Sequence, residues 1–168
     1  MTIAELNSLD RTRFVEAIGW VFEGSPWVAE RAWQARPFRD LEALIAAMQS
    51  EVERAGPEQQ FALIRAHPDL GTRTRISPAS TEEQSGAGLD SLTPEEFERL
   101  ARLNSTYRTT FGFPFVYAVK GSTKHDILDA LERRIHAYPD EEYREALRHV
   151  YRIAEFRLRE VLSRGLHG

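Results

Sequence analysis

Apolar residues recur every three or four positions through most of this chain, the spacing that places them on one side of a helix. In the final stretch Tyr143, Leu147, Val150 and Leu158 keep to that side. Polar residues that commonly cap helices stand just ahead of such stretches. The predicted starts are Thr2 with Glu5, Asp10, Ser25 before Pro26, Asp40, Thr93 before Pro94, Ser122 or Thr123, and Asp140. The pattern predicts an all-α fold: a compact single-domain bundle of about eight helices over residues 1–168, with one buried extended segment.

The helical spacing stops at His67. Pro68 disfavours helical geometry in the residue before it, and residues 71–79 are rich in Thr, Ser and Arg, which predicts a loop. Ser80 then has the place of an N-cap, with Glu83 at the third helical position. Glycines soon after keep this predicted helix short.

The stretch from Phe111 to Val119 is the only strong apolar run without helical spacing. Gly112 and Pro114 argue against a central strand, because glycine weakens a strand and proline lacks the N–H that a ladder needs. We therefore expect a buried extended connection. It is either ordinary core or a pocket wall whose unpaired backbone groups hydrogen-bond a planar polar ligand.

Composition narrows the class of protein. The chain has 168 residues, of which 42% are hydrophobic and 29% charged, as in a single globular domain. A net charge of −4, with basic residues spread along the chain, argues against a nucleic-acid partner. No apolar run approaches the roughly 20 residues of a membrane helix, and the first residues lack a signal-peptide pattern. We therefore expect no membrane partner and a cytoplasmic location.

Several kinds of catalytic site are excluded by missing residues and motifs. The absence of cysteine removes disulfides, thiolate metal sites and cysteine nucleophiles. The patterns His-Glu-x-x-His, Gly-x-Ser-x-Gly and Gly-x-Gly-x-x-Gly are also missing, as is a phosphate-binding loop. We expect no metal and no bound cofactor. An enzyme of this sequence would work with acid–base groups and hydrogen bonds.

His67 is the leading candidate for acid–base chemistry. Histidine titrates near neutral pH, and this one precedes a proline at a helix end, beside a polar loop. His125, His136 and His149 fall on predicted helices with mixed faces, and His167 lies in the C-terminal tail. The alternative for His67 is a surface or capping histidine.

Two further candidates also have structural alternatives. The segment from Ser80 to Gln84 would present free N–H groups to an anion or a carbonyl oxygen at a helix start, although a capping box alone explains its residues. Arg157 falls in an apolar stretch of the final helix. A buried arginine needs an anionic partner, such as Glu83 or a substrate carboxylate. A solvated surface arginine is the alternative.

Four stretches, read in order, match those of one enzyme family. They are His67-Pro68-Asp69-Leu70-Gly71, Ser80 to Leu89, Leu103-Asn104-Ser105-Thr106-Tyr107, and Phe111-Gly112-Phe113-Pro114-Phe115. The opening Phe14 to Gly24 and the final helix around Ala154 to Leu158 extend the match over nearly the whole chain. The chain thus resembles the 2-oxo-4-hydroxy-4-carboxy-5-ureidoimidazoline (OHCU) decarboxylases, which complete the conversion of urate to allantoin.

The resemblance implies an all-helical fold, a homodimer, no cofactor and a ureidoimidazoline substrate. It places the catalytic pair on His67 and Glu83. The substrate-binding residues that it implies are Pro68, Ser80, Gln84, Phe115, Val116, Tyr117, Ala118, Val119 and Arg157. One departure is the loop between His67 and Ser80, which is shorter than in many relatives and carries Arg73 and Arg75 where lysine and small residues are common.

Two other functions use the same residues differently. A related enzyme would open or hydrolyse a ureide ring without releasing carbon dioxide. A non-enzymatic helical module would use Phe111 to Val119 as an interface and would turn over no purine-derived substrate. A repeat array or a coiled coil would favour that module, and the sequence contains neither pattern.

Overall fold

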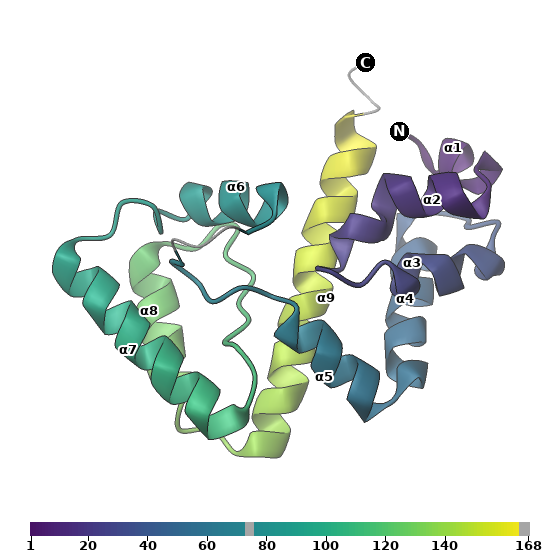
Figure 1. Cartoon of the computed structure of the whole chain (residues 1–168). Coiled ribbons are helices and arrows are strands. Elements are labelled where there is room, and N and C mark those ends of the chain that lie inside the picture. Colours follow the sequence, from purple (N-terminus) through teal and green to yellow (C-terminus); the bar gives the residue numbers. More distant parts are fainter. Residues whose placement is uncertain (73–75, 165–168) are drawn as a thin grey trace. The chain divides into compact units, whose positions relative to one another are not determined.

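The structure is a computed structural model that describes residues 1–72 and 76–164. Helices dominate these residues and no strand occurs among them, which confirms the predicted all-α class (Figure 1). The α-helices and short 3₁₀ helices of the described residues are α1 (Ile3–Ser8), α2 (Arg11–Ile18), η1 (Gly19–Val21), α3 (Trp27–Ala32), η2 (Trp33–Ala35), α4 (Leu41–Ala55), α5 (Pro57–Arg65), α6 (Pro78–Gly86), α7 (Pro94–Phe111), α8 (Lys124–Arg134) and α9 (Pro139–Arg164).

The chain divides into two compact units. One contains Met1–Ala66 together with the chain from Tyr151 onward, and the other contains His67–Val150. The long helix α9 therefore contributes its first part to one unit and its second part to the other. The single domain over residues 1–168 stays a prediction.

The first unit is built from α1 to α5 and the C-terminal part of α9. Helix α3 packs on both α2 and α4. On α4, Leu44, Met48 and Val52 are four residues apart and all are buried, as the apolar spacing predicts. The hydroxyl of Tyr151 donates to the carboxylate of Glu53 and so attaches α9 to α4.

The second unit is built from α6, α7, α8 and the first part of α9. Helices α7 and α8 pack together and bury Leu100 and Ile127. Nζ of Lys124, at the start of α8, lies 2.7 Å from the carboxylate of Glu96 in the first turn of α7. This hydrogen bond, together with the cap at Thr93, lowers the pKa of Glu96 to about 2. The ion pair between the two helix starts therefore persists into acid.

Most of the predicted helix starts are confirmed. In each, a cap side chain accepts a hydrogen bond from an amide in the first turn of the following helix. These caps are Thr2, Asp10, Asp40, Thr93 and Thr123. Thr123, rather than Ser122, is thus the cap of α8.

Two predicted starts are displaced, that of α3 by one residue and that of α9 by two. Pro26 directly precedes α3, and the hydroxyl of Ser25 donates to the carbonyl of Glu23 instead of capping the helix. Helix α9 begins at Pro139, so Asp140 lies inside its first turn. In both places a proline next to the cap-like residue marks the start, because its fixed φ suits the first positions of a helix.

Helix α6 begins earlier than the sequence suggested. Ser77 is its N-cap, since its Oγ accepts a hydrogen bond from the amide of Ser80 at 3.2 Å, and Pro78 is the first helical residue. The prediction that Ser80 caps this helix was therefore wrong. The predicted loop over residues 71–79 was wrong for Pro78 and Ala79, which are helical. Ser80 and Glu83 are interior helix residues, and no capping box accounts for them.

The predicted buried extended connection lies between α7 and α8. Gly112 ends α7 with φ of +79°, a left-handed conformation that glycine adopts without strain. Residues 113–119, called the connecting segment from here on, form neither helix nor strand, and all except Tyr117 are buried. Figure 1 shows this stretch as a long trace between the two helices.

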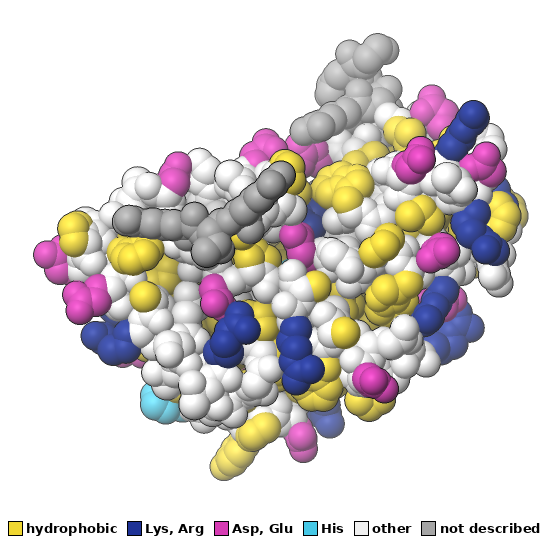
Figure 2. Space-filling model, in the orientation of Figure 1, with side chains coloured by type: hydrophobic (Ala, Val, Ile, Leu, Met, Phe, Trp, Pro, Cys, Tyr) yellow, Lys and Arg dark blue, Asp and Glu magenta, His cyan; other side chains and the backbone are white. Residues whose placement is uncertain are grey.

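The surface carries mixed charge. On the face shown in Figure 2, Lys and Arg side chains are interspersed with Asp and Glu. Among the described residues, no helix combines the length and the apolar character needed to cross a bilayer. The expected absence of nucleic-acid and membrane partners stays a prediction.

Candidate active site

The loop that begins at His67 is held against α7. Nδ2 of Asn104 donates to the carbonyl of Leu70 at 3.0 Å. One turn later on the same side of α7, Arg108 lies 2.9 Å from the carboxylate of Asp69. His67 itself is only 6% exposed, which rules out the surface-histidine alternative. Helix α7 thus holds Asp69 and Leu70, which follow closely after His67 in the chain.

The same loop is joined to α6 at Gly71. Its amide donates to Oε1 of Gln84 at 2.9 Å. Gly71 has φ of +72°, and a Cβ added there would lie 2.4 Å from a methyl group of Leu100. The left-handed conformation favours glycine at this position, and any larger residue would also force the Leu100 side chain to move. The His67 loop and α6 therefore meet at this hydrogen bond.

Three predicted site residues share one side of α6. Ser80, Glu83 and Gln84 are three and four residues apart, which places them on the same side of a helix. Ser80 and Gln84 are buried and Glu83 is half-buried, whereas the intervening Thr81 and Glu82 are exposed. The side of α6 that faces the interior is thus polar. Because apolar residues normally occupy such positions, this arrangement suits a site better than a core.

Hydrogen bonds restrict which groups of α6 are able to bind a ligand. The amide of Ser80 donates to Ser77, so the prediction that backbone N–H groups near Ser80 hold a ligand fails for this amide, and its hydroxyl is the candidate group. Gln84 uses Oε1 for Gly71, which fixes the orientation of its side-chain amide. Nε2 of Gln84 has no hydrogen-bond partner among the described residues and is a candidate donor to a carbonyl oxygen.

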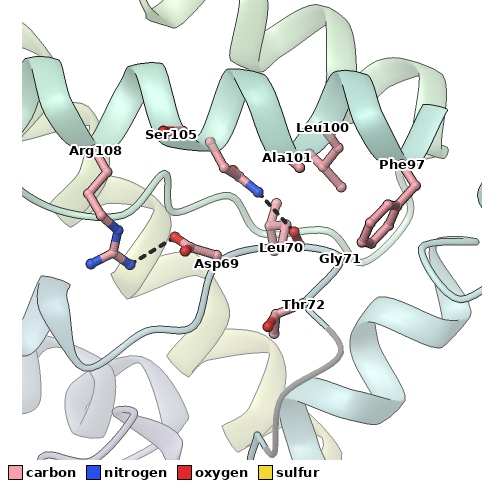
Figure 3. Close-up of a pocket in the computed structure, with 10 residues that line it drawn as sticks. Asp69, Leu70, Gly71, Thr72, Phe97, Leu100, Ala101, Ser105 and Arg108 are labelled. Atoms are coloured by element: carbon pink, nitrogen blue, oxygen red, sulfur yellow. Dashed lines mark hydrogen bonds and ion pairs between the residues drawn. The ribbon is translucent and has the colours of Figure 1, made fainter. Parts of the chain in front are cut away.

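A cavity of about 360 Å³ lies beside the loop on its α7 side (Figure 3). Its lining consists of Asp69, Leu70, Gly71, Thr72, Phe97, Leu100, Ala101, Asn104, Ser105 and Arg108. Figure 3 shows Arg108 reaching toward Asp69 at one end and Phe97 at the other. None of the predicted site residues lines this cavity. It is therefore distinct from the pocket that the sequence predicts around the side chain of His67.

The connecting segment is held by two buried polar side chains. Nη1 of Arg134 donates to the carbonyl of Val116 at 3.0 Å. The amide of Ala118 donates to Nδ1 of His149 at 2.9 Å. These two backbone groups are therefore occupied by the protein. We predicted that residues 115–119 bind substrate through their backbone groups. The amide of Ala118 is no longer a candidate for this role, because it is bonded to His149.

Other amides of this segment are available. Those of Tyr117 and Val119 have no hydrogen-bond partner among the described residues. In an extended chain, the backbone groups of consecutive residues point to opposite sides, so those of alternate residues share a side. The carbonyl of Val116 and the amide of Ala118 thus belong to one side, and the amides of Tyr117 and Val119 belong to the other. One side of the segment is anchored and the other is a candidate ligand-binding side.

Arg134 belongs to a buried charged network. Its Nε donates to Oε1 of Glu142 at 2.6 Å, and Nη2 lies 2.5 Å from the same oxygen without hydrogen-bond geometry. The hydroxyl of Tyr107 on α7 also donates to this oxygen. Burial, reinforced by the Glu142 carboxylate, raises the pKa of Tyr107 far above its usual range, so the hydroxyl stays a donor. Tyr107 also packs edge-on against Phe115, with ring centroids 5.4 Å apart. This network joins α7, α8 and α9 behind the connecting segment.

Arg157 lies in the first unit and is 3% exposed, which rules out the solvated alternative. Its Nη1 lies 2.8 Å from the carboxylate of Glu23 and donates to the carbonyls of Trp20 and Val21. Glu23, which the sequence does not single out, is thus an anionic partner of Arg157. A contact of Arg157 with substrate stays a prediction.

Two buried polar residues that hold the connecting segment, His149 and Arg134, were not predicted. His149 was assigned to a mixed helix face, yet it is buried and bonded to the connecting segment. A signal was available: His149 is three residues after Ala146 and four before Ile153, both buried. A polar residue at core spacing on a helix must find a partner. Arg134 gives the same signal, because it is three residues after the buried Leu131.

Three residues named in the sequence analysis lie outside the described residues. They are His167 and the two arginines by which the loop differs from many relatives, Arg73 and Arg75. Among the described residues, no group of three or more histidine, aspartate or glutamate side chains is placed to hold a metal ion.

Sequence comparison places these features in a family context. A family model described as OHCU decarboxylase matches residues 7–159. The 2-oxo-4-hydroxy-4-carboxy-5-ureidoimidazoline decarboxylase of Haloferax volcanii is 49% identical, over 97% of this chain and 97% of its own length. That of Halalkalicoccus jeotgali is 46% identical, over 96% of this chain and 92% of its own.

Structural comparison agrees. A crystal structure of (S)-allantoin synthase superposes with a TM-score of 0.80 at 32% identity. The match covers 96% of this chain and 54% of that protein, so this chain spans about half of its length.

Proposed function

The chain belongs to the OHCU decarboxylase family, and from that premise we propose that it converts 2-oxo-4-hydroxy-4-carboxy-5-ureidoimidazoline to (S)-allantoin during urate breakdown. It is then a carboxy-lyase that acts without a cofactor. The observation that carries the activity is the 49% identity, over almost the full length of both chains, to a curated decarboxylase of that name.

The reaction requires positioning and one proton. The bond between ring carbon 4 and the carboxylate breaks, carbon dioxide leaves, and the electron pair passes into the adjacent C=N group at carbon 5. The hydroxyl on carbon 4 gives up its proton and becomes a ring carbonyl, and a proton delivered to one face of carbon 5 completes the product. Because the substrate is its own electron sink, the protein has to hold the carboxylate out of the ring plane, stabilise the developing charge and supply the proton.

His67 is the proposed proton donor. It is buried, its loop is anchored to α6 and α7, and imidazole exchanges protons near neutral pH. Glu83, on the side of α6 that meets this loop, orients either the ureido group of the substrate or the imidazole. Pro68 follows His67 directly and contributes to the binding surface.

The remaining contacts hold the ring. The hydroxyl of Ser80 and Nε2 of Gln84 are the proposed donors from α6. The amides of Tyr117 and Val119 are the proposed donors to the ring oxygens, where the charge develops. Preorganised donors of this kind typically contribute about 10²- to 10³-fold to turnover. The buried side chains of Phe115, Val116 and Ala118 support this surface.

Two serines of α6 separate a role in folding from a role in binding. We expect Ser77→Ala to remove the cap and to lower the free energy of unfolding by about 1 kcal/mol, with turnover per folded molecule unchanged. We expect Ser80→Ala to leave the cap intact and to lower kcat/KM about tenfold through loss of one substrate hydrogen bond. Urea denaturation and steady-state kinetics on the same preparations measure both. An unchanged kcat/KM in Ser80→Ala would remove Ser80 from the binding site.

The activity is tested on substrate made in place. Urate is supplied with an enzyme that oxidises it and an enzyme that hydrolyses the oxidation product, and circular dichroism follows the allantoin formed. We expect this protein to produce one optically active allantoin rapidly, with release of carbon dioxide. Racemic product at the enzyme-free rate would refute the proposal. Product without carbon dioxide would indicate ureide hydrolysis, and no turnover would favour the interaction module.

Assembly and location are two further proposals. We propose that the protein is a homodimer of the cytoplasm. Light scattering during gel filtration measures the mass directly, and a mass near the 19.3 kDa of one chain would contradict the dimer.

A further inference from the structure

His149 is a buried histidine for which the proposed reaction assigns no role. It lies on α9 with 8% of its side chain exposed, between the connecting segment and the start of its own helix. Nδ1 lies 2.9 Å from the amide nitrogen of Ala118, and Nε2 lies 3.2 Å from Oε1 of Glu145. Both ring nitrogens therefore have defined partners, as expected for a residue with a fixed orientation.

These partners determine where the imidazole carries its proton. The amide of Ala118 donates, so Nδ1 must present its lone pair. The proton of the neutral ring is then on Nε2, directed at the Glu145 carboxylate. Glu145 thus keeps Nδ1 available as the acceptor, in the way that second partners fix the tautomer of metal-binding histidines.

The ring also fixes the position of Tyr117. The imidazole stacks on the phenol ring with centroids 4.8 Å apart and an angle of 24° between the planes. Tyr117 in turn stacks on Phe115, with centroids 5.8 Å apart. His149 therefore contacts two consecutive residues of the segment, Tyr117 through its ring and Ala118 through its amide.

We propose that His149 is a positioning residue of the decarboxylation: it anchors the amide of Ala118, so that the amides of Tyr117 and Val119 on the other side of the segment meet the substrate. The inference rests on the proposed function, because it assumes that this segment binds the ring oxygens. Its physical basis is rigidity. Donors that are already in place lose no conformational freedom when the ring oxygens bind, so a segment released at Ala118 is expected to bind the substrate more weakly.

A matched pair of variants isolates the hydrogen bond. In His149→Asn the side-chain oxygen is attached to Cγ, as Nδ1 is in histidine, so an acceptor for the Ala118 amide is retained. In His149→Leu a methyl group of similar size takes that place. Both variants lose the contact with Glu145 and the stacking on Tyr117, so these losses cancel in the comparison. Kinetics are measured with substrate made in place and normalised to the folded fraction.

We expect KM of His149→Leu to be about tenfold above that of His149→Asn, with kcat differing less, since one buried hydrogen bond is lost. Hydrogen exchange of the Ala118 amide should be slow in the wild type and in His149→Asn and faster in His149→Leu. A purely structural histidine would change the folded fraction but not KM. Equal KM in the two variants of an active enzyme would overturn the positioning role alone. A wild-type protein that releases no carbon dioxide would overturn the proposed function and this inference with it.

Discussion

His67→Asn is expected to lower kcat at least about a hundredfold while the protein stays folded. General acid–base catalysis by a positioned side chain contributes about 10²- to 10⁴-fold, and asparagine cannot donate a proton at neutral pH. Asparagine retains polar groups at a position that is 6% exposed, which limits the loss of stability. The measurement is the rate of (S)-allantoin formation by circular dichroism, normalised to folded protein from a urea titration.

The matched control is the same substitution at an exposed histidine. His136 follows α8 and is exposed, so His136→Asn should keep kcat within about twofold of the wild type, as surface changes usually do. Near-normal turnover in folded His67→Asn would remove this residue from the proton transfer. A comparable loss in both variants would show that the effect is not specific to the site.

The second large effect concerns the charged network behind the connecting segment. Glu142 is 1% exposed and is the carboxylate partner of Arg134 and of the Tyr107 hydroxyl. Glu142→Ala leaves the guanidinium buried without its counter-charge, a change that costs about 3–5 kcal/mol. We therefore expect a lower urea midpoint and a melting temperature lower by about 10 °C.

The neighbouring Glu141 is exposed and provides the control, because Glu141→Ala should change the free energy of unfolding by less than about 0.5 kcal/mol. Glu142→Gln removes the charge but keeps an acceptor for Arg134 and Tyr107, so its loss should be intermediate. If Glu142→Ala and Glu141→Ala unfold at the same urea concentration, the network contributes nothing to stability.

The helices were predictable because their signals are local. A cap such as Thr93 and an apolar spacing such as that of Leu44, Met48 and Val52 act within one helix, so the sequence displays them directly. The start of α6 was misplaced because two serines compete for it. Ser80 with Glu83 matches a capping box, but Pro78 follows Ser77 and favours the earlier start.

The partners of buried polar residues were not predictable in the same way. Ala118 and His149 are 31 residues apart, and Glu23 and Arg157 are 134 apart, so each pair is formed by tertiary packing. Sequence spacing is able to indicate that His149 faces the core, but it does not identify the group that satisfies it. For His67, the prediction of a catalytic role rested on the resemblance and on its place before Pro68.

Arg134 has a consequence for attempts to make this protein more heat-stable. Replacing a buried ion pair with well-packed apolar residues often stabilises a protein by about 1–4 kcal/mol, so Arg134 and Glu142 are natural targets for such redesign. Arg134 also holds the carbonyl of Val116, and an apolar replacement would release it. Under the proposed role of the connecting segment in substrate binding, we expect a replacement of Arg134 that raises heat resistance to lower turnover, a trade-off of the kind seen where a stabilising change loosens a functional element.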